Sequence, residues 1–194
     1  MRTRSIVCCA LLLLGTAAFG ADGPVAKGSM LLSGGLSFTM QSGDLYENDD
    51  GDAFTTLAFT PGFGYFVSPG LMVGANVNYL KMSQGDNSAS VTSFGPMVTY
   101  YFGANNGRTE FKGTVYPYLG ALAAFGSSDD GDDESDDDPS ITTFGFKGGI
   151  VYMMSNAVGL DAGVHYSSDK WSIDDESASG STIQIAVGIT ACVF

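Results

Sequence analysis

The single histidine of the chain, His165, lies two residues before Ser167, and this pair has the residue types that nucleophilic catalysis needs. Alternate residues of a β-strand point to the same face, so a histidine base and a serine nucleophile at this spacing would face the same way. Glu176 is a conceivable third member that would orient the histidine. The alternative, which we favour, is a histidine held by hydrogen bonds in the interior of the fold.

A second group that could do chemistry is a run of carboxylates in the third quarter of the chain. Calcium prefers such oxygen ligands, but the run lacks the glycine at the sixth position and the glutamate at the twelfth that complete an EF-hand loop. A solvated, self-repelling segment is the preferred interpretation, with loosely bound Ca²⁺ as the weaker one. The calcium candidates are Asp129, Asp130, Asp132, Asp133, Glu134, Asp136, Asp137 and Asp138.

Two further charged residues, Lys147 and Asp161, lie in segments that otherwise contain mostly apolar and small residues. Their positions in the local alternation place both on the same side as His165. Interior charges are normally paired, so we expect an ion pair between them that would plug the interior of the fold.

The overall charge limits the possible partners. The chain has 21 acidic and 8 basic residues, a net charge of −13, and 27 glycines among 194 residues. Phosphate backbones require a basic surface, so this balance argues against nucleic-acid binding.

The first twenty residues have the pattern of a secretory signal peptide. Arg2 and Arg4 precede the apolar run from 6 to 14, and the small residues Ala18 and Gly20 form a cleavage site. We therefore expect residues 1–20 to be removed and residues 21–194 to form one exported domain. Cleavage leaves Cys192 as the only cysteine, which excludes a framework of internal disulfides.

The elements that must position these residues are strands, because apolar residues recur with a period of two rather than 3.6. Near the C-terminus, for example, Ile183, Ile185, Val187 and Ile189 alternate with polar or small residues. Eight such segments are each long enough for a tilted membrane strand, which needs about 9–11 residues. The predicted strands are 28–40, 54–67, 71–82, 91–102, 115–126, 141–154, 157–167 and 182–194.

An even number of strands with amphipathic faces predicts an all-β fold, an eight-stranded antiparallel up-and-down transmembrane β-barrel. Four long loops are expected at 41–53, 83–90, 127–140 and 168–181, alternating with shorter turns, with a longer turn at 103–114 as the exception. Of the 21 acidic residues, only Asp22, Glu110 and Asp161 lie outside these loops, so we expect acidic loops on the external face. The alternative is a secreted sandwich or lipocalin-like barrel, which would alternate too.

Large aromatic residues favour the membrane barrel over the secreted fold. Many of them lie near strand ends on the apolar face, where interfacial girdles occur. This set is Phe59, Phe63, Tyr65, Phe94, Tyr100, Phe102, Tyr116, Tyr118, Phe144 and Tyr152. The opposite face has mainly small residues, which fit the narrow interior of eight strands.

The sequence resembles the small outer-membrane β-barrels that include opacity-type and OmpX-like proteins, a group filed with the porin family. The similar features are the signal peptide, the segments 94–102 and 116–121, and the terminal Phe194. The resemblance implies a location in the bacterial outer membrane, contact with its lipid and lipopolysaccharide, and a monomeric barrel. It also implies that Phe194 is the signal that the barrel-assembly machinery reads.

The function implied is a structural or surface-interaction barrel, with a narrow porin-like conduit for solutes or ions as the alternative. Residues 165–167 also resemble the His-x-Ser pair of barrel-shaped lipid A deacylases. Their alternation points His165 and Ser167 inward, whereas an enzyme acting on a membrane lipid needs them facing the bilayer. We therefore predict no enzymatic activity and no required cofactor.

Overall fold

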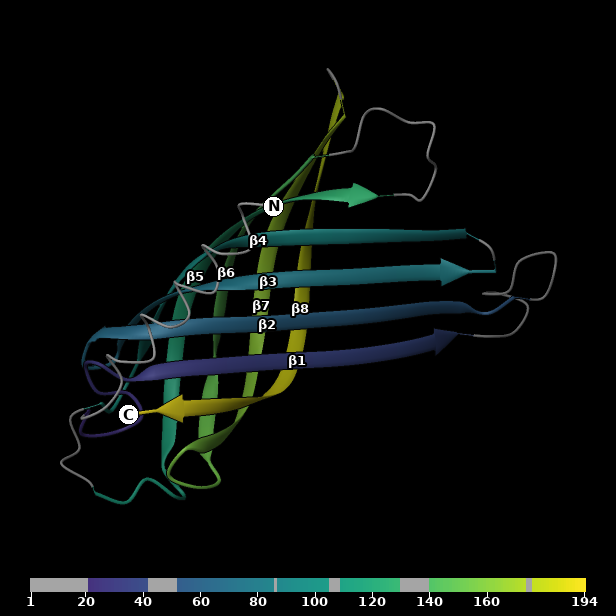
Figure 1. Cartoon of the computed structure of the whole chain (residues 1–194). Coiled ribbons are helices and arrows are strands. Elements are labelled where there is room, and N and C mark those ends of the chain that lie inside the picture. The colour runs from purple at the N-terminus through teal and green to yellow at the C-terminus, as the bar shows by residue number, and fades with distance from the viewer. Residues whose placement is uncertain (1–20, 42–51, 86, 105–108, 130–139, 174–175) are drawn as a thin grey trace, which may run out of the picture.

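The fold is an antiparallel barrel of eight strands, seen in a computed structural model (Figure 1). The structure describes residues 21–41, 52–85, 87–104, 109–129, 140–173 and 176–194. The strands are β1 (Met30–Gln41), β2 (Phe54–Ser68), β3 (Leu71–Gln84), β4 (Asn87–Tyr101), β5 (Val115–Asp129), β6 (Ser140–Met153), β7 (Val158–Ile173) and β8 (Glu176–Val193). This confirms the predicted fold class and the number of strands.

Each strand pairs with its neighbours along the chain, and β1 pairs with β8 to close the barrel. The start of β1 and the end of β8 therefore lie at one end, which we call the turn end; the opposite end, where β1 connects to β2 and β7 to β8, is the loop end. No helix in the described ranges is long and apolar enough to cross a membrane.

The connections differ from the predicted alternation of long loops and short turns. Strands β3 and β4 are separated only by residues 85–86, and β7 and β8 only by residues 174–175, so the long loops predicted at 83–90 and 168–181 are wrong. Serine and asparagine residues near these two connections are typical of loops. In the structure they belong to the strands, because each is paired with a residue of the neighbouring strand. At the turn end, Gly70, at φ 77°, completes the tight connection between β2 and β3.

Side chains on the outer and inner faces of the barrel wall alternate along the strands, as the period of two predicts. Apolar side chains on the outer face remain exposed, including Phe94 and Val98 on β4 and Phe144 and Phe146 on β6. Tyr116 and Tyr118 are an exception to the prediction, because both point inward and are buried. In β5 the outer positions belong to Val115, Pro117 and Leu119, and the nearby glycine and alanine residues obscured which face was apolar in the sequence.

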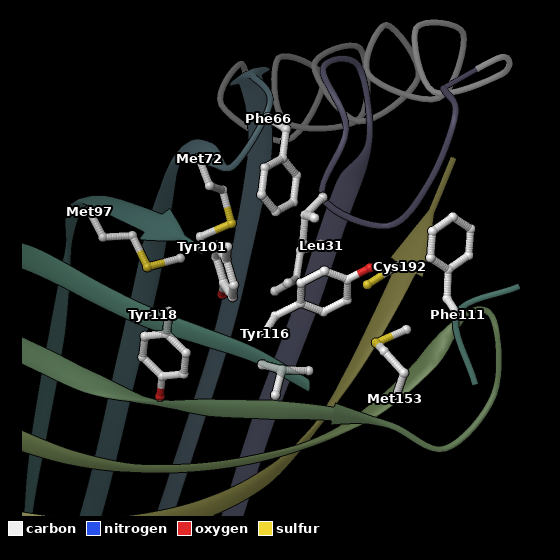
Figure 2. Packing of buried hydrophobic residues seen from close by; sticks show 12 residues of the cluster. Leu31, Phe66, Met72, Met97, Tyr101, Phe111, Tyr116, Tyr118, Met153 and Cys192 are labelled. Atoms are coloured by element: carbon white, nitrogen blue, oxygen red, sulfur yellow. The ribbon is translucent and has the colours of Figure 1, made fainter. Parts of the chain in front are cut away.

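A cluster of apolar side chains fills the interior at the turn end, and we call it the plug (Figure 2). Phe66 and Met72 are fully buried, and the ring of Tyr101 lies 5.5 Å from that of Phe66 and 5.4 Å from that of Tyr118. The plug residues are Val25, Leu31, Phe66, Met72, Met97, Tyr101, Phe111, Tyr116, Tyr118, Val151, Met153 and Cys192. Because these residues come from the N-terminal segment, from every strand except β7 and from the connection between β4 and β5, the plug ties most of the turn end together.

Candidate functional site

The candidate site is a cavity of about 500 Å³ inside the barrel, on the loop side of the plug. Residues from all eight strands line it, and they include small, polar and large apolar side chains. The polar side chains most relevant to chemistry are Asn76, Lys147, Asp161, His165, Ser167, Asp169 and Gln184. The three residues predicted to be polar groups of the interior, Lys147, Asp161 and His165, therefore all border this one space.

Tyr118 connects the plug to the charged residues of the cavity. Its hydroxyl donates a hydrogen bond of 2.8 Å to Oδ1 of Asp161, and its ring lies 5.8 Å from Nζ of Lys147. The other close contact of the Lys147 ammonium is Sδ of Met97, at 3.5 Å. Within the part of the chain that the structure describes, Lys147 and Asp161 are thus linked through Tyr118 and not through a direct ion pair.

His165 and Ser167 both face the cavity, but they have different surroundings. In the strand register His165 lies between Lys147 on β6 and Gln184 on β8. The Ser167 hydroxyl donates to Oδ2 of Asp169 at 3.3 Å, and Thr143 donates to Oδ1 of the same carboxylate at 2.6 Å. The hydroxyl is therefore bonded to a carboxylate rather than to an imidazole base, and the Glu176 side chain lies outside the described residues.

The sequence did not single out Tyr118, Asp169 or Gln184 as site residues. Tyr118 was placed on the lipid face, and Asp169 was assigned to a loop. Gln184 was recognised only as a polar residue in the alternation of the last strand. A period-two reading that continued past 167 into the serine-rich segment would have identified Asp169 as inward, because it shares its parity with Asp161 and His165.

Several other predicted features lie outside the described residues. These are the signal peptide at 1–20 and the calcium candidates at 130–138; of Asp129 only the backbone, at the end of β5, is described. No group of three or more histidine, cysteine, aspartate or glutamate residues could hold a metal ion within the described ranges. The cleaved signal and the calcium site remain predictions.

The C-terminal residue packs onto the plug. The Phe194 ring lies 5.7 Å from that of Phe111 in an edge-to-face arrangement, and Cys192 beside it is buried as a free thiol. Phe194 therefore has a structural role at the turn end, whatever its part in assembly.

No protein-family model matches the sequence, and no curated protein matches it significantly. Solved structures do match the fold. Neisserial surface protein A (NspA) covers 87% of this chain and 98% of its own, with 19% identity and a TM-score of 0.57. The outer membrane protein OprG from Pseudomonas aeruginosa covers 89% of this chain and 99% of its own, with 14% identity and a TM-score of 0.53. The chain therefore has the eight-stranded fold of the small outer-membrane β-barrels.

Proposed function

We propose that this protein is an integral outer-membrane barrel that anchors acidic segments at its loop end and conducts no solute. The observation that carries the proposal is the plug, which fills the interior at the turn end with buried aromatic and methionine side chains. Eight strands enclose only enough space for side chains, so such a cluster leaves no continuous water path.

The outer face of the barrel supports placement in a bilayer. Each of the eight strands presents exposed large apolar side chains, among them Leu36, Phe59, Phe146 and Ile185. In water each such side chain would forgo roughly 25 cal/mol for every Å² of apolar surface left unburied. A lipid environment removes this cost and explains why a closed barrel presents so much apolar surface.

The acidic segments support a role at the cell surface. The two longest connections at the loop end are residues 42–53 and 130–139, and most of the acidic residues lie in or beside them. With the termini on the periplasmic side, these segments face the outside. Divalent cations such as Ca²⁺ would then bridge their carboxylates to lipopolysaccharide phosphates. The similar Neisserial protein is itself named a surface protein.

The proposal extends to biogenesis, in which a signal peptide at 1–20 directs export and the barrel-assembly machinery reads Phe194. The product is a monomer, since one chain closes its own barrel.

The decisive experiment combines gel mobility, protease treatment and conductance. Protein from washed outer membranes is expected to shift in mobility on boiling, and protease added to intact cells is expected to cut only in 42–53 and 130–139. Purified protein in planar bilayers is expected to show no conductance steps. A soluble periplasmic protein without a mobility shift would contradict the membrane placement, and regular conductance steps would contradict the closed interior.

The narrow conduit is the second candidate, and the cavity on the loop side of the plug favours it. A solute could enter this space from outside but would meet Phe66, Tyr101 and Met153 before reaching the turn end. Conduction therefore requires the plug to rearrange, and the bilayer measurement separates the two candidates. A lipid A-modifying activity is disfavoured because the Ser167 hydroxyl donates to the Asp169 carboxylate rather than to the His165 imidazole.

A further inference from the structure

The barrel wall is incomplete between its first and last strands. In the described residues, β1 and β8 pair only from Met30 with Val193 to Gly34 with Ile189. By contrast, β1 pairs with β2 as far as Gln41, and β8 pairs with β7 from Glu176. Figure 1 shows β1 and β8 close together near the C-terminus and diverging away from it. The loop half of the wall therefore has a slot between these two strand edges.

The exposed fractions of side chains give independent support for the slot. Among the described apolar side chains, the highest exposures include Leu36 at 73% and Phe38 at 66% on β1, and Ile183 at 73%, Ile185 at 81% and Val187 at 67% on β8. On the closed side of the barrel the highest value is 67%, at Phe146 on β6, which is below the values of Leu36, Ile183 and Ile185. A strand edge without a neighbour leaves its outward side chains uncovered on one side, which explains this concentration.

The slot joins the cavity to the lipid-facing surface. The cavity is lined both by inward residues such as Lys147 and His165 and by outward residues of the slot edges, namely Leu36, Ile185 and Val187. The same space is thus polar inside the barrel and apolar where it meets the bilayer.

The polar groups of the cavity differ in how far the protein itself satisfies them. The Asp161 carboxylate accepts from Tyr118, and the Asp169 carboxylate accepts from Thr143 and Ser167. The Lys147 ammonium has three donor hydrogens, yet its close contacts are the weak acceptor Met97 Sδ and the Tyr118 ring. Lys147 is therefore the cationic group of the cavity whose donor hydrogens a ligand can still engage, and Asn76 Oδ1 is an unpaired acceptor in the same space.

The strand register places a row of polar side chains between Lys147 and the edge of the slot. Lys147 lies opposite His165, and His165 lies opposite Gln184, so the three side chains form one row across β6, β7 and β8. All three line the cavity, and Gln184 belongs to the edge strand of the slot. We infer that the slot binds a single-chain anionic amphiphile from the membrane, with its headgroup at the Lys147, His165 and Gln184 row and its alkyl chain between Leu36 and Val187.

The test uses dodecyl phosphate as the probe and the fluorescence of Trp171, the single tryptophan, which lines the cavity. With the mature chain in phosphatidylcholine vesicles, dodecyl phosphate is expected to give a saturable change at one molecule per barrel. Dodecyltrimethylammonium should bind at least about tenfold more weakly, since its headgroup is cationic, and Lys147→Met should weaken dodecyl phosphate by a similar factor. Equal binding of both amphiphiles would overturn the proposal, as would equal binding of inorganic phosphate without a chain.

A disulfide across the slot tests whether the amphiphile binds through the opening between β1 and β8. Continuing the observed register places Leu36 opposite Val187, so Leu36→Cys with Val187→Cys, on a Cys192→Ala background, should close the slot when oxidised. The matched control is Leu32→Cys with Ala191→Cys, because these two residues are already paired. They are four residues from Leu36 and Val187 along each strand, so both pairs occupy the same kind of position in the alternation of hydrogen-bonded and non-hydrogen-bonded pairs. Oxidation should weaken dodecyl phosphate binding at least about tenfold in the first pair and leave it unchanged in the control.

Two results of the cross-linking experiment would overturn the inference. One is unchanged binding in the first pair with its disulfide formed. The other is a disulfide-linked dimer from Leu36→Cys alone in the same vesicles, which would show that a second copy of the chain occupies the slot. Gel mobility before and after boiling verifies that each variant retains the barrel, so a loss of binding is separable from a failure to fold and from failure of the surface-anchor function.

Discussion

At the scale of single residues, the interior of the barrel depends on polar contacts between strands. Asp161 on β7 is stabilised by the Tyr118 hydroxyl from β5, although 43 residues separate them in the sequence. A partly buried carboxylate without this donor would retain much of its desolvation cost.

Replacing Tyr118 with phenylalanine removes this hydrogen bond and keeps the ring in the plug. We expect a loss of about 1–3 kcal/mol in the free energy of unfolding, because hydrogen bonds to charged groups contribute in this range. The measurement is urea unfolding in lipid vesicles, followed by gel mobility. Tyr152→Phe is the control, since Tyr152 lies exposed on the outer face. Equal losses in the two variants would show that the bond to Asp161 contributes nothing specific.

A close approach of two strands makes Gly95 sensitive to any side chain. A Cβ atom there would lie 1.8 Å from the Ala123 carbonyl oxygen, whereas a Cβ at Gly34 would meet nothing within 4 Å. We expect Gly95→Ala to destabilise the barrel by about 1–3 kcal/mol through overpacking and Gly34→Ala to change it by less than about 0.5 kcal/mol. The same unfolding assay checks both, and a tolerated Gly95→Ala would show that β4 and β5 can separate without cost.

At the scale of elements, each strand has one face toward the outside of the barrel and one toward the interior, and the interior face changes from apolar to polar along its length. On β2, Phe66 belongs to the plug while Thr60 and Gly62 line the cavity. The packing of a strand therefore depends on distance from the turn end as well as on the face.

The two faces of β2 can be compared by one substitution made at two positions. Phe66→Leu removes volume from a fully buried site, and we expect it to cost about 1–2 kcal/mol through the cavity that remains. Phe63→Leu on the opposite face exchanges one lipid-compatible side chain for another and should change stability by less than about 0.5 kcal/mol. Urea unfolding of both variants in the same vesicles decides the matter; a larger effect at Phe63 would mean that the faces are assigned the wrong way round.

At the scale of the whole molecule, the barrel combines a sealed turn end, a cavity that opens toward the loop end and a wall that is unpaired on one side. The seal is built by side chains and not by backbone, since eight strands leave a lumen that side chains just fill. Removing those side chains should therefore open the lumen without abolishing the barrel.

A triple variant tests whether the plug closes the lumen. We expect Phe66→Ala, Met72→Ala and Tyr101→Ala together to produce conductance steps in planar bilayers, where the unaltered protein produces none. The matched control replaces an outward residue on each of the same strands, Phe63→Ala, Val73→Ala and Tyr100→Ala, and should remain silent. A heat-dependent mobility shift must confirm that both variants fold. A folded but silent plug variant would show that the lumen is closed elsewhere.

The sequence by itself determined the strands and their two faces, because apolar residues of one parity with a period of two require an extended chain with one apolar side. A sandwich would show the same alternation, so closure was decided by the pairing of β1 with β8. Ile183, Ile185 and Val187 face outward as that pattern requires. It also placed Lys147, Asp161 and His165 in the interior, since strand parity is a local property.

Only the tertiary structure decided which residues meet across the barrel and where pairing ends. Tyr118 could be assigned to the interior only once β5 was paired with β4 and β6, because alternation was weak in its own segment. The short hairpins at 85–86 and 174–175 depend on partner strands that stabilise polar residues in extended form. The slot between β1 and β8 depends on residues more than 140 positions apart, and no local pattern encodes where their pairing stops.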